Sequence, residues 1–170
     1  MSSNIEIKAH VSAPENLMQK VKQLCGHHDD LLLQKDIFYR LQSYRIKLRN
    51  VNGTSELIIY KRDNSTEPKQ SSYLRIPIAF PEYTHKILNA ILGTRGIIEK
   101  KRTLFFYENT RIHVDEVQKL GNFLEFEVVL NNNETASEGI AIANELMRCL
   151  EIKHEDLVAE SYIDLLESIS

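Results

Sequence analysis

The 170-residue sequence predicts an α+β fold: a closed, eight-stranded antiparallel β-barrel with flanking helices. About eight short segments alternate apolar and polar residues with the period of two that strands have. Tight-turn signals such as Asn52-Gly53 join most of them, which favours hairpins and antiparallel pairing. Eight strands can close into a barrel that holds one small ligand. No internal repeat or linker interrupts residues 1–170, so we expect a single domain.

The first half of the chain contains one predicted helix and four strands that surround it. Residues 5–11 alternate apolar with polar side chains, which predicts the opening strand. Residues 14–25 are predicted to be helical, with Ser12 or Ala13 near the cap and Gly26 as the stop. A polar loop is predicted over residues 63–70. The remaining strands of this half are predicted over residues 31–39, 44–50 and 57–62.

The second half begins with a strand over residues 71–79, in which Pro77 marks an edge or an end. Pro81 opens and Gly93 closes a predicted helix over residues 81–92. Apolar residues at helical spacing predict two further helices, over residues 134–150 and 155–169. Strands joined by tight turns are predicted over residues 97–107, 110–117 and 123–130.

Composition excludes several classes of protein. An apolar fraction of 42% is ordinary for a globular chain. The sequence contains no run of 18 uncharged apolar residues, so we predict no membrane span. The first residues lack the pattern of a signal peptide, and the two cysteines are too few for a disulfide framework. A pI of about 6.1 argues against nucleic-acid binding. We therefore expect a cytoplasmic protein, a monomer or a homodimer, that contacts neither membrane nor nucleic acid.

Charge is distributed unevenly along the chain. Residues 40–75 carry eight basic and three acidic side chains, whereas residues 115–170 carry thirteen acidic and three basic ones. A basic middle that faces an acidic end favours an anionic ligand held partly through metal ions.

Several predicted strands concentrate charge on one face. Neighbours two apart on a strand, such as Lys47 and Arg49, lie about 7 Å from each other. Two like charges at that separation repel by about 0.6 kcal/mol in water but by about 2.4 kcal/mol in a protein interior of effective dielectric 20. The faces are therefore either solvated, or they line a lumen that binds a polyanion together with Mg²⁺ or Mn²⁺. His113 alternates with Arg111 and Asp115, so it faces that lumen or is a plain strand residue.

A series of ordered motifs resembles the CYTH superfamily, also called triphosphate tunnel metalloenzymes. The similarity runs nearly end to end, and it is strongest to the CyaB-like class IV adenylyl cyclase branch, which is related to thiamine triphosphatases. The motifs are Asn4-Ile5-Glu6-Ile7-Lys8, Gln34-Lys35-Asp36-Ile37-Phe38-Tyr39, Arg45-Ile46-Lys47-Leu48-Arg49, Tyr60-Lys61-Arg62, Glu99-Lys100-Lys101-Arg102-Thr103, Arg111-Ile112-His113-Val114-Asp115, Leu120-Gly121-Asn122-Phe123-Leu124-Glu125-Phe126-Glu127 and Ser161-Tyr162-Ile163-Asp164-Leu165-Leu166.

The resemblance implies an eight-stranded tunnel and a role for each charged position. Its implied ligands of Mg²⁺ or Mn²⁺ are Glu6, Asp115, Glu125 and Glu127. Its implied catalytic residues are Glu6, Lys8 and Glu127. Its implied substrate-binding residues are Lys8, Arg45, Lys47, Arg49, Lys61, Arg75, Lys100, Arg102 and Arg111.

Three functions follow from this resemblance. The leading expectation is a metal-dependent phosphohydrolase acting on an inorganic, nucleoside or thiamine triphosphate. The runner-up is a class IV adenylyl cyclase, but the His-Phe pair that precedes the first motif in cyclases of this type does not occur here. A third is a non-catalytic polyphosphate-binding module, consistent with Asn4 at the position of the first glutamate of the family's opening motif.

Overall fold

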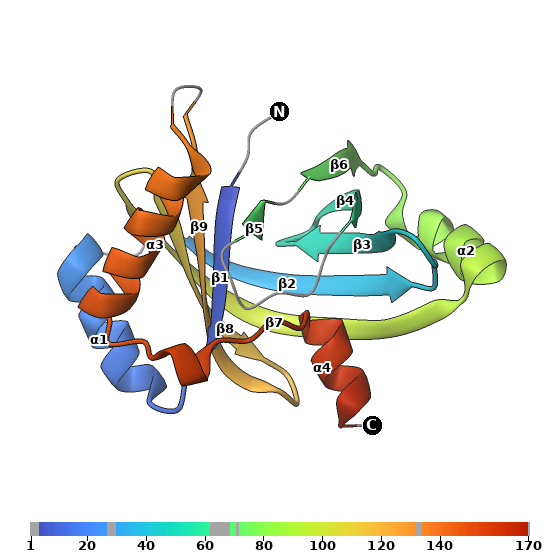
Figure 1. The fold of residues 1–170 in the computed structure, drawn as a ribbon. Coiled ribbons are helices and arrows are strands. Elements are labelled where there is room, and N and C mark those ends of the chain that lie inside the picture. Colours follow the sequence, from blue (N-terminus) through green and yellow to red (C-terminus); the bar gives the residue numbers. More distant parts are fainter. Residues whose placement is uncertain (1–3, 27–29, 62–68, 71, 132–133, 170) are drawn as a thin grey trace.

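The computed structural model describes residues 4–26, 30–61, 69–70, 72–131 and 134–169, and these form one curled sheet with helices on its outside (Figure 1). The strand order is β5-β1-β9-β8-β7-β2-β3-β4-β6, and every neighbouring pair is antiparallel. The strands are β1 Asn4–His10, β2 Asp30–Tyr39, β3 Arg45–Val51, β4 Thr54–Lys61, β5 Lys69–Gln70, β6 Ser72–Pro77, β7 Thr94–Tyr107, β8 Thr110–Val117 and β9 Gly121–Val129.

The predicted antiparallel sheet is confirmed, whereas complete closure of the barrel is supported only in part. The two ends of the strand order, β5 and β6, follow each other closely in the chain. However, β5 contributes only two residue pairs to β1, Ile5 with Gln70 and Glu6 with Lys69. The sheet therefore curls into a half-barrel, with β5 paired to β1 at one end of the order and β6 paired to β4 at the other. Most of the predicted loop over residues 63–70 lies outside the described residues.

The core lies on the outer face of the sheet, under the helices. Helices α1 (Pro14–Cys25) and α3 (Ala136–Cys149) cover β1, β8 and β9, where Ile112, Phe126 and Val128 are almost completely buried. Because side chains alternate along a strand, the charged residues between these apolar ones face the inside of the curl.

Two smaller clusters anchor the other helices. Helix α2 (Pro81–Leu92) packs Leu88 and Leu92 against the outer face of β2 and β3. Helix α4 (Tyr162–Ser168) buries Ile163 in a cluster with Phe38, Ile98 and Phe123. In the described part of the chain, no helix is both long and apolar enough to cross a membrane.

The hairpin and helix signals were mostly correct, with one exception. Asn52 and Gly53 both have positive φ, 48° and 88°, as the turn between β3 and β4 requires. The helix predicted over residues 155–169 is wrong in its first half. A short 3₁₀ helix, His154–Asp156, is followed by extended chain, because the Val158 N–H donates to the Lys8 carbonyl and Leu157 bridges to β1. Helix α4 starts only after Ser161, whose hydroxyl and backbone N–H both contact the Asp164 carboxylate.

Candidate functional site

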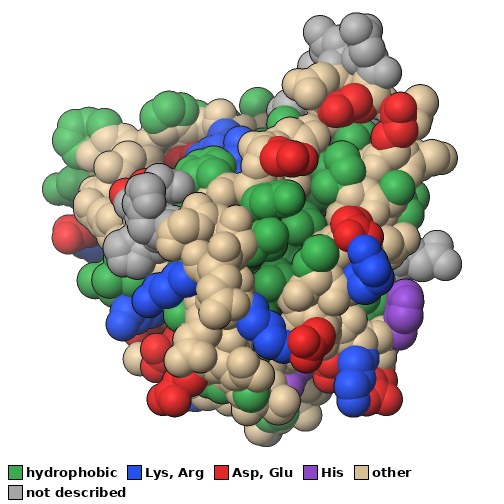
Figure 2. All heavy atoms as spheres, turned by 90° about the vertical axis from the view of Figure 1, so that its left-hand side faces the viewer, with side chains coloured by type: hydrophobic (Ala, Val, Ile, Leu, Met, Phe, Trp, Pro, Cys, Tyr) green, Lys and Arg blue, Asp and Glu red, His purple; other side chains and the backbone are tan. Residues whose placement is uncertain are grey.

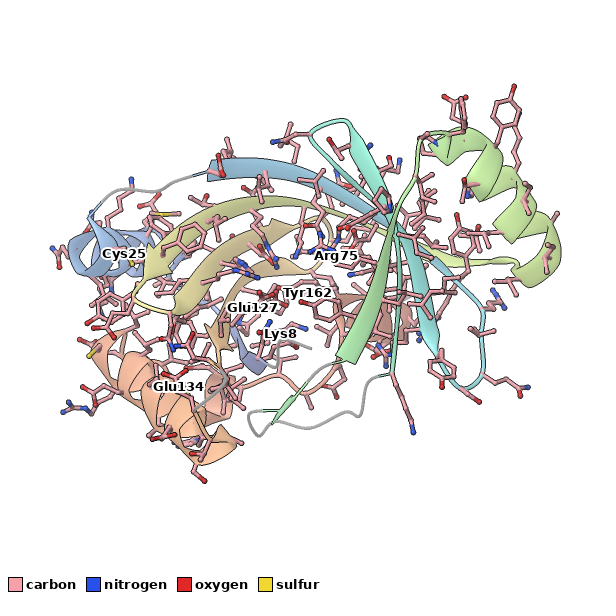
Figure 3. The ribbon with its side chains drawn as sticks, turned by 90° about the horizontal axis from the view of Figure 1, so that it is seen from above. Lys8, Cys25, Arg75, Glu127, Glu134 and Tyr162 are labelled. Carbon is pink, nitrogen blue, oxygen red and sulfur yellow. The ribbon has the colours of Figure 1, made fainter. Side chains whose placement is uncertain are left out.

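The inner face of the sheet encloses a cavity of about 770 Å³. The described residues around it carry eight cationic and five acidic side chains, an excess of three positive charges. On the outer face drawn in Figure 2, by contrast, basic and acidic groups are interspersed. Lys8, Glu127 and Tyr162 lie within the curl, whereas Cys25 and Glu134 lie outside it (Figure 3). The charged strand faces therefore line an enclosed space, not bulk solvent.

One end of the cavity is rich in carboxylates. In the register of β1, β9 and β8, Glu6 lies opposite Glu127, which lies opposite Arg111. In the adjacent row Lys8 lies opposite Glu125, which lies opposite His113. Three glutamates from two neighbouring strands, Glu6, Glu125 and Glu127, thus share this end of the cavity.

Glu125 is surrounded by cations. Arg102 donates a hydrogen bond to its Oε2, and Lys8 Nζ lies 3.6 Å from its Oε1. Burial raises the pKa of the Glu125 carboxyl, but the charges of Arg102 and Lys100 outweigh it and hold that pKa well below its usual value. Glu125 is therefore ionised despite its burial.

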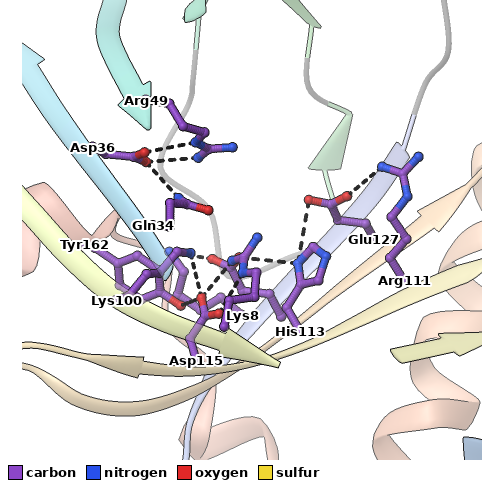
Figure 4. A network of polar contacts seen from close by, with 12 residues as sticks. Lys8, Gln34, Asp36, Arg49, Lys100, Arg111, His113, Asp115, Glu127 and Tyr162 are labelled. Atoms are coloured by element: carbon purple, nitrogen blue, oxygen red, sulfur yellow. Dashed lines mark hydrogen bonds and ion pairs between the residues drawn. The ribbon is translucent and has the colours of Figure 1, made fainter. Parts of the chain in front are cut away.

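Asp115 is the most enclosed carboxylate, with no exposed side-chain surface, and both its oxygens already have donors (Figure 4). Lys100 Nζ lies 2.7 Å and the Tyr162 hydroxyl 3.0 Å from Oδ2. Arg102 donates to both oxygens, at 2.6 and 2.7 Å. The geometry suits a residue that positions two cavity cations better than the metal ligand implied by the family resemblance.

Asp36 plays the corresponding part at the other end of the cavity, and our sequence analysis gave it no role. Lys47 Nζ and Arg49 Nε each lie 2.9 Å from its carboxylate, and Gln34 donates at 3.1 Å. Burial raises the pKa of the Asp36 carboxyl, but the charges of Lys47 and Arg49 lower it by more than burial raises it. The group is therefore ionised. The signal was available, because Gln34 and Asp36 alternate on β2 toward the same face as the cations.

Tyr162 connects the start of α4 to the floor of the cavity. Its ring lies under two ammonium groups, with Lys8 Nζ 4.3 Å and Lys100 Nζ 4.8 Å from the ring centroid. Burial, followed by the nearby charges of Glu125 and Asp115, raises the pKa of its phenol well above the usual value. The hydroxyl therefore stays protonated and donates a hydrogen bond to Asp115.

The other sequence-predicted cations divide into two groups. Lys61, Arg75 and Arg111 line the cavity near solvent, and Arg75 forms a two-point ion pair with Glu56 at 2.7 and 2.8 Å. Arg45 is not among the residues that line the cavity. Its guanidinium donates instead to the Ser161 hydroxyl and, at 2.8 Å, to Asp164. It thereby ties β3 to α4.

The carboxylate end offers donors of the kind that Mg²⁺ and Mn²⁺ prefer, although they are not gathered around one point. Within the described residues, no three histidine, cysteine or acidic side chains stand close enough to hold a metal as they are. Among the residues that the structure describes, two buried polar atoms at this end have no hydrogen-bond partner: Asn4 Oδ1 and His113 Nδ1. Both residues line the cavity beside the row of Glu6 and Glu127. Carboxylate oxygens, together with these two neutral atoms that can act as metal ligands, fit a divalent cation.

Comparisons with known proteins identify the family and the fold. The model of the CYTH domain matches residues 2–162. The chain is 22% identical over 171 residues to "Putative adenylate cyclase MJ0240" from Methanocaldococcus jannaschii, covering 95% of this chain and 97% of that protein. It superimposes on the PH1012 protein from Pyrococcus horikoshii OT3 with a TM-score of 0.85 and 24% identity, over 95% of this chain and 98% of the other. HpAC1 from Hippeastrum, described as revealing a dominant triphosphatase activity, has a TM-score of 0.71 and 13% identity, over 100% and 97% of the two chains.

Proposed function

This chain belongs to the CYTH family, and on that premise we propose that it is a divalent-metal-dependent phosphohydrolase of a triphosphate, inorganic, nucleoside or thiamine. One observation carries the proposal. The carboxylates at one end of the cavity are paired with cavity cations, Glu125 with Arg102 and Glu127 with Arg111. Such an array matches a ligand that contains both a metal cation and phosphate anions.

The match follows from exchange of partners. Each buried charge needs an opposite charge nearby, because an unpaired ion in a protein interior costs several kcal/mol. A triphosphate without a metal forms ion pairs with the arginines and leaves Glu125 and Glu127 facing negative phosphate oxygens. A metal-bound triphosphate gives the carboxylates a cation and the arginines an anion at the same time. The excess of three positive charges around the cavity favours a complex that is still negative overall.

The residues then have distinct roles. Glu6, Glu125 and Glu127 hold the divalent ion, which when bound supplies Lewis-acid activation of the phosphate and of a water. Lys8, Lys100 and Arg102 at the floor stabilise the charge that develops on the equatorial oxygens. The remaining cations of the cavity extend the phosphate path: Lys47, Arg49, Lys61, Arg75 and Arg111.

Two glutamates near the mouth are the candidates for water orientation. The Glu127 side chain is 22% exposed and lies next to Glu6 in the register of β1 and β9, so both can reach a water at the terminal phosphate. Asp115 acts as a positioning residue in this scheme, because it fixes Lys100 and Arg102 in the orientation that meets the phosphates.

A substrate panel tests the proposal. Inorganic tripolyphosphate, ATP and thiamine triphosphate are incubated with Mg²⁺ or Mn²⁺, and orthophosphate and cyclic nucleotide are measured separately. We expect metal-dependent orthophosphate release that is lost when Glu125 and Glu127 are both replaced by alanine. Release that survives this double substitution contradicts the proposal.

Adenylyl cyclase activity is the second candidate, because the relative from M. jannaschii bears that name. In that reaction the ribose 3′-hydroxyl attacks the α-phosphorus of ATP, and pyrophosphate leaves. The same panel separates the two activities by product, since a cyclase yields cyclic AMP and pyrophosphate while the hydrolase yields orthophosphate.

A non-catalytic polyphosphate-binding module is the third candidate, and Asn4 is the residue that favours it. An asparagine offers only a neutral oxygen, which weakens a metal site relative to a carboxylate. Tight tripolyphosphate binding without turnover, with either metal, is the result expected of such a module.

A further inference from the structure

His113 has an unusual place at the carboxylate end of the cavity. It lies on β8 between Arg111 and Asp115, and only 6% of its side chain is exposed. Its Nδ1 lies 3.9 Å from Glu125 Oε2 and 3.9 Å from Glu127 Oε1 (Figure 4). No hydrogen bond satisfies this nitrogen within the part of the chain that is described. The imidazole therefore faces two carboxylates across a gap too long for a direct hydrogen bond.

The gap is unfavourable as it stands, whichever tautomer is present. A proton on Nδ1 is too far from either carboxylate to be shared, so a buried donor goes unsatisfied. A lone pair on Nδ1 instead faces two negative charges. A cation between the three side chains removes the penalty, since the lone pair and both carboxylates then point at positive charge.

We propose that Nδ1 of His113 is a ligand of the divalent cation held by Glu125 and Glu127, so that the site combines nitrogen and oxygen donors. This inference rests on the proposed metal-dependent function and adds a residue that the charge pattern did not assign. Asn4, whose Oδ1 also has no partner among the described residues, lies beyond the Glu6–Glu127 row on the other side and supplies a neutral oxygen to the same region.

A histidine ligand should change which divalent ion the site prefers. Mg²⁺ takes oxygen ligands and holds its waters tightly, so an imidazole nitrogen adds little to its binding. First-row transition ions accept imidazole nitrogen as well as carboxylate oxygen. We therefore expect the site to bind Mn²⁺ and Co²⁺ more tightly than Mg²⁺, and we expect His113 to be the source of the difference.

Pulsed EPR of the Mn²⁺-loaded protein tests the assignment directly, since it detects nuclei bonded to the metal. We expect a ¹⁴N coupling in the wild-type protein that changes to a ¹⁵N coupling when the protein is grown on ¹⁵N-labelled histidine. This measurement needs no substitution, so it does not depend on a variant that folds. Bound Mn²⁺ without any nitrogen coupling overturns the proposal and indicates that water fills the gap.

Substitution provides the second arm. In His113→Gln, we expect loss of the coupling and about a 10- to 100-fold weaker Mn²⁺ affinity, whereas Mg²⁺ affinity, measured by competition, changes less than about threefold. His10→Gln is the matched control, because His10 is an exposed histidine on β1 outside the cavity lining. A coupling that persists in His113→Gln overturns the assignment.

The two proposals fail in different ways. Metal-dependent phosphate release together with Mn²⁺ that lacks nitrogen coupling rejects the role of His113 alone. Failure of the wild-type protein to bind Mn²⁺, together with no metal-dependent release from any triphosphate, rejects the proposed function and the ligand with it.

Discussion

Arg102 and Asp115 face each other across β7 and β8 and form a two-point ion pair, with Nε 2.6 Å from Oδ1 and Nη2 2.7 Å from Oδ2. The same guanidinium also donates to Glu125. One arginine therefore links the floor of the cavity to its carboxylate end. Residues such as Asp115 hold the cations in place, whereas residues such as Glu127 can exchange partners when a ligand binds. We therefore expect substitutions in the two groups to have different effects.

Asp115→Asn tests the holding role. The change leaves Lys100 and Arg102 buried beside a neutral group, and removing one partner of a buried ion pair costs about 3–5 kcal/mol. We expect a loss of that size in the free energy of unfolding, measured by urea denaturation without divalent ions. Glu145→Gln is the control, because the Glu145–Arg148 pair is exposed, and we expect no measurable change there. Unchanged stability with lost metal binding would make Asp115 a metal ligand after all.

Glu127→Gln tests the exchanging role. This carboxylate is partly exposed and pairs with Arg111 at 3.2 Å. We expect turnover to fall by at least about 100-fold, while the free energy of unfolding changes by less than about 1 kcal/mol. Steady-state phosphate release and urea denaturation measure the two effects.

Glu116→Gln is the matched control for that substitution, because Glu116 is an exposed glutamate on β8 outside the cavity. Its turnover and stability should equal those of the wild-type protein. A Glu127→Gln protein that turns over normally excludes this glutamate from metal binding and from water orientation.

We expect the protonation of Lys47 to make the affinity for tripolyphosphate depend on pH. Burial, followed by the charge of Arg49, lowers its pKa to about 8, although Asp36 acts in the opposite direction. Bound phosphate favours the charged ammonium and raises that pKa, so the complex takes up a proton near pH 8. Affinity for tripolyphosphate should therefore fall as the pH rises above about 8.

Calorimetric titration at several pH values measures this effect. In Lys47→Met we expect a shallower pH dependence, and comparison with the wild-type protein cancels the protonation of tripolyphosphate itself. Lys20→Met, on the outer helix α1, is the control and should keep the wild-type slope. Identical slopes in all three proteins exclude Lys47 as the titrating group.

Arg45 and Arg111 should differ in what they contribute. Arg111 lines the cavity, and loss of a charge-assisted hydrogen bond to phosphate costs about 1.5–3 kcal/mol, so Arg111→Gln should weaken tripolyphosphate binding at least about 10-fold. Arg45→Gln should change affinity less than about twofold but lower the thermal midpoint, because Arg45 holds α4 through Ser161 and Asp164. Binding isotherms and thermal unfolding of both variants decide the matter. Equal losses of affinity place Arg45 on the phosphate path.

Removal of the metal should leave the fold intact. Glu125 and Asp115 already have cationic partners within the protein, so chelation with EDTA exposes no unpaired buried charge. We expect the thermal midpoint to move by less than about 4 °C, which corresponds to about 1 kcal/mol or less, while turnover is abolished. Unfolding on chelation indicates a structural metal instead.

Most strands, and the gathering of their charges on one face, were predictable from the sequence because both depend on local pattern. The alternation along residues 5–11 and the Asn52-Gly53 turn identify strands and a hairpin without knowledge of distant residues. The helix predicted over residues 155–169 failed for the opposite reason. Its first part is extended because Val158 and Leu157 bond to β1, a strand about 150 positions away in the chain.

The sequence by itself determined the sheet, most of the helices and the kinds of charge that share a strand face, since these follow from periodicity and turn chemistry. Only the tertiary structure decided which charges meet. Asp115 and Asp36 lie under pairs of cations, Arg45 lies against α4, and His113 Nδ1 lies between two glutamates. Strand register and the curl of the sheet bring these residues together across long stretches of chain, and local pattern contains no information about such distances.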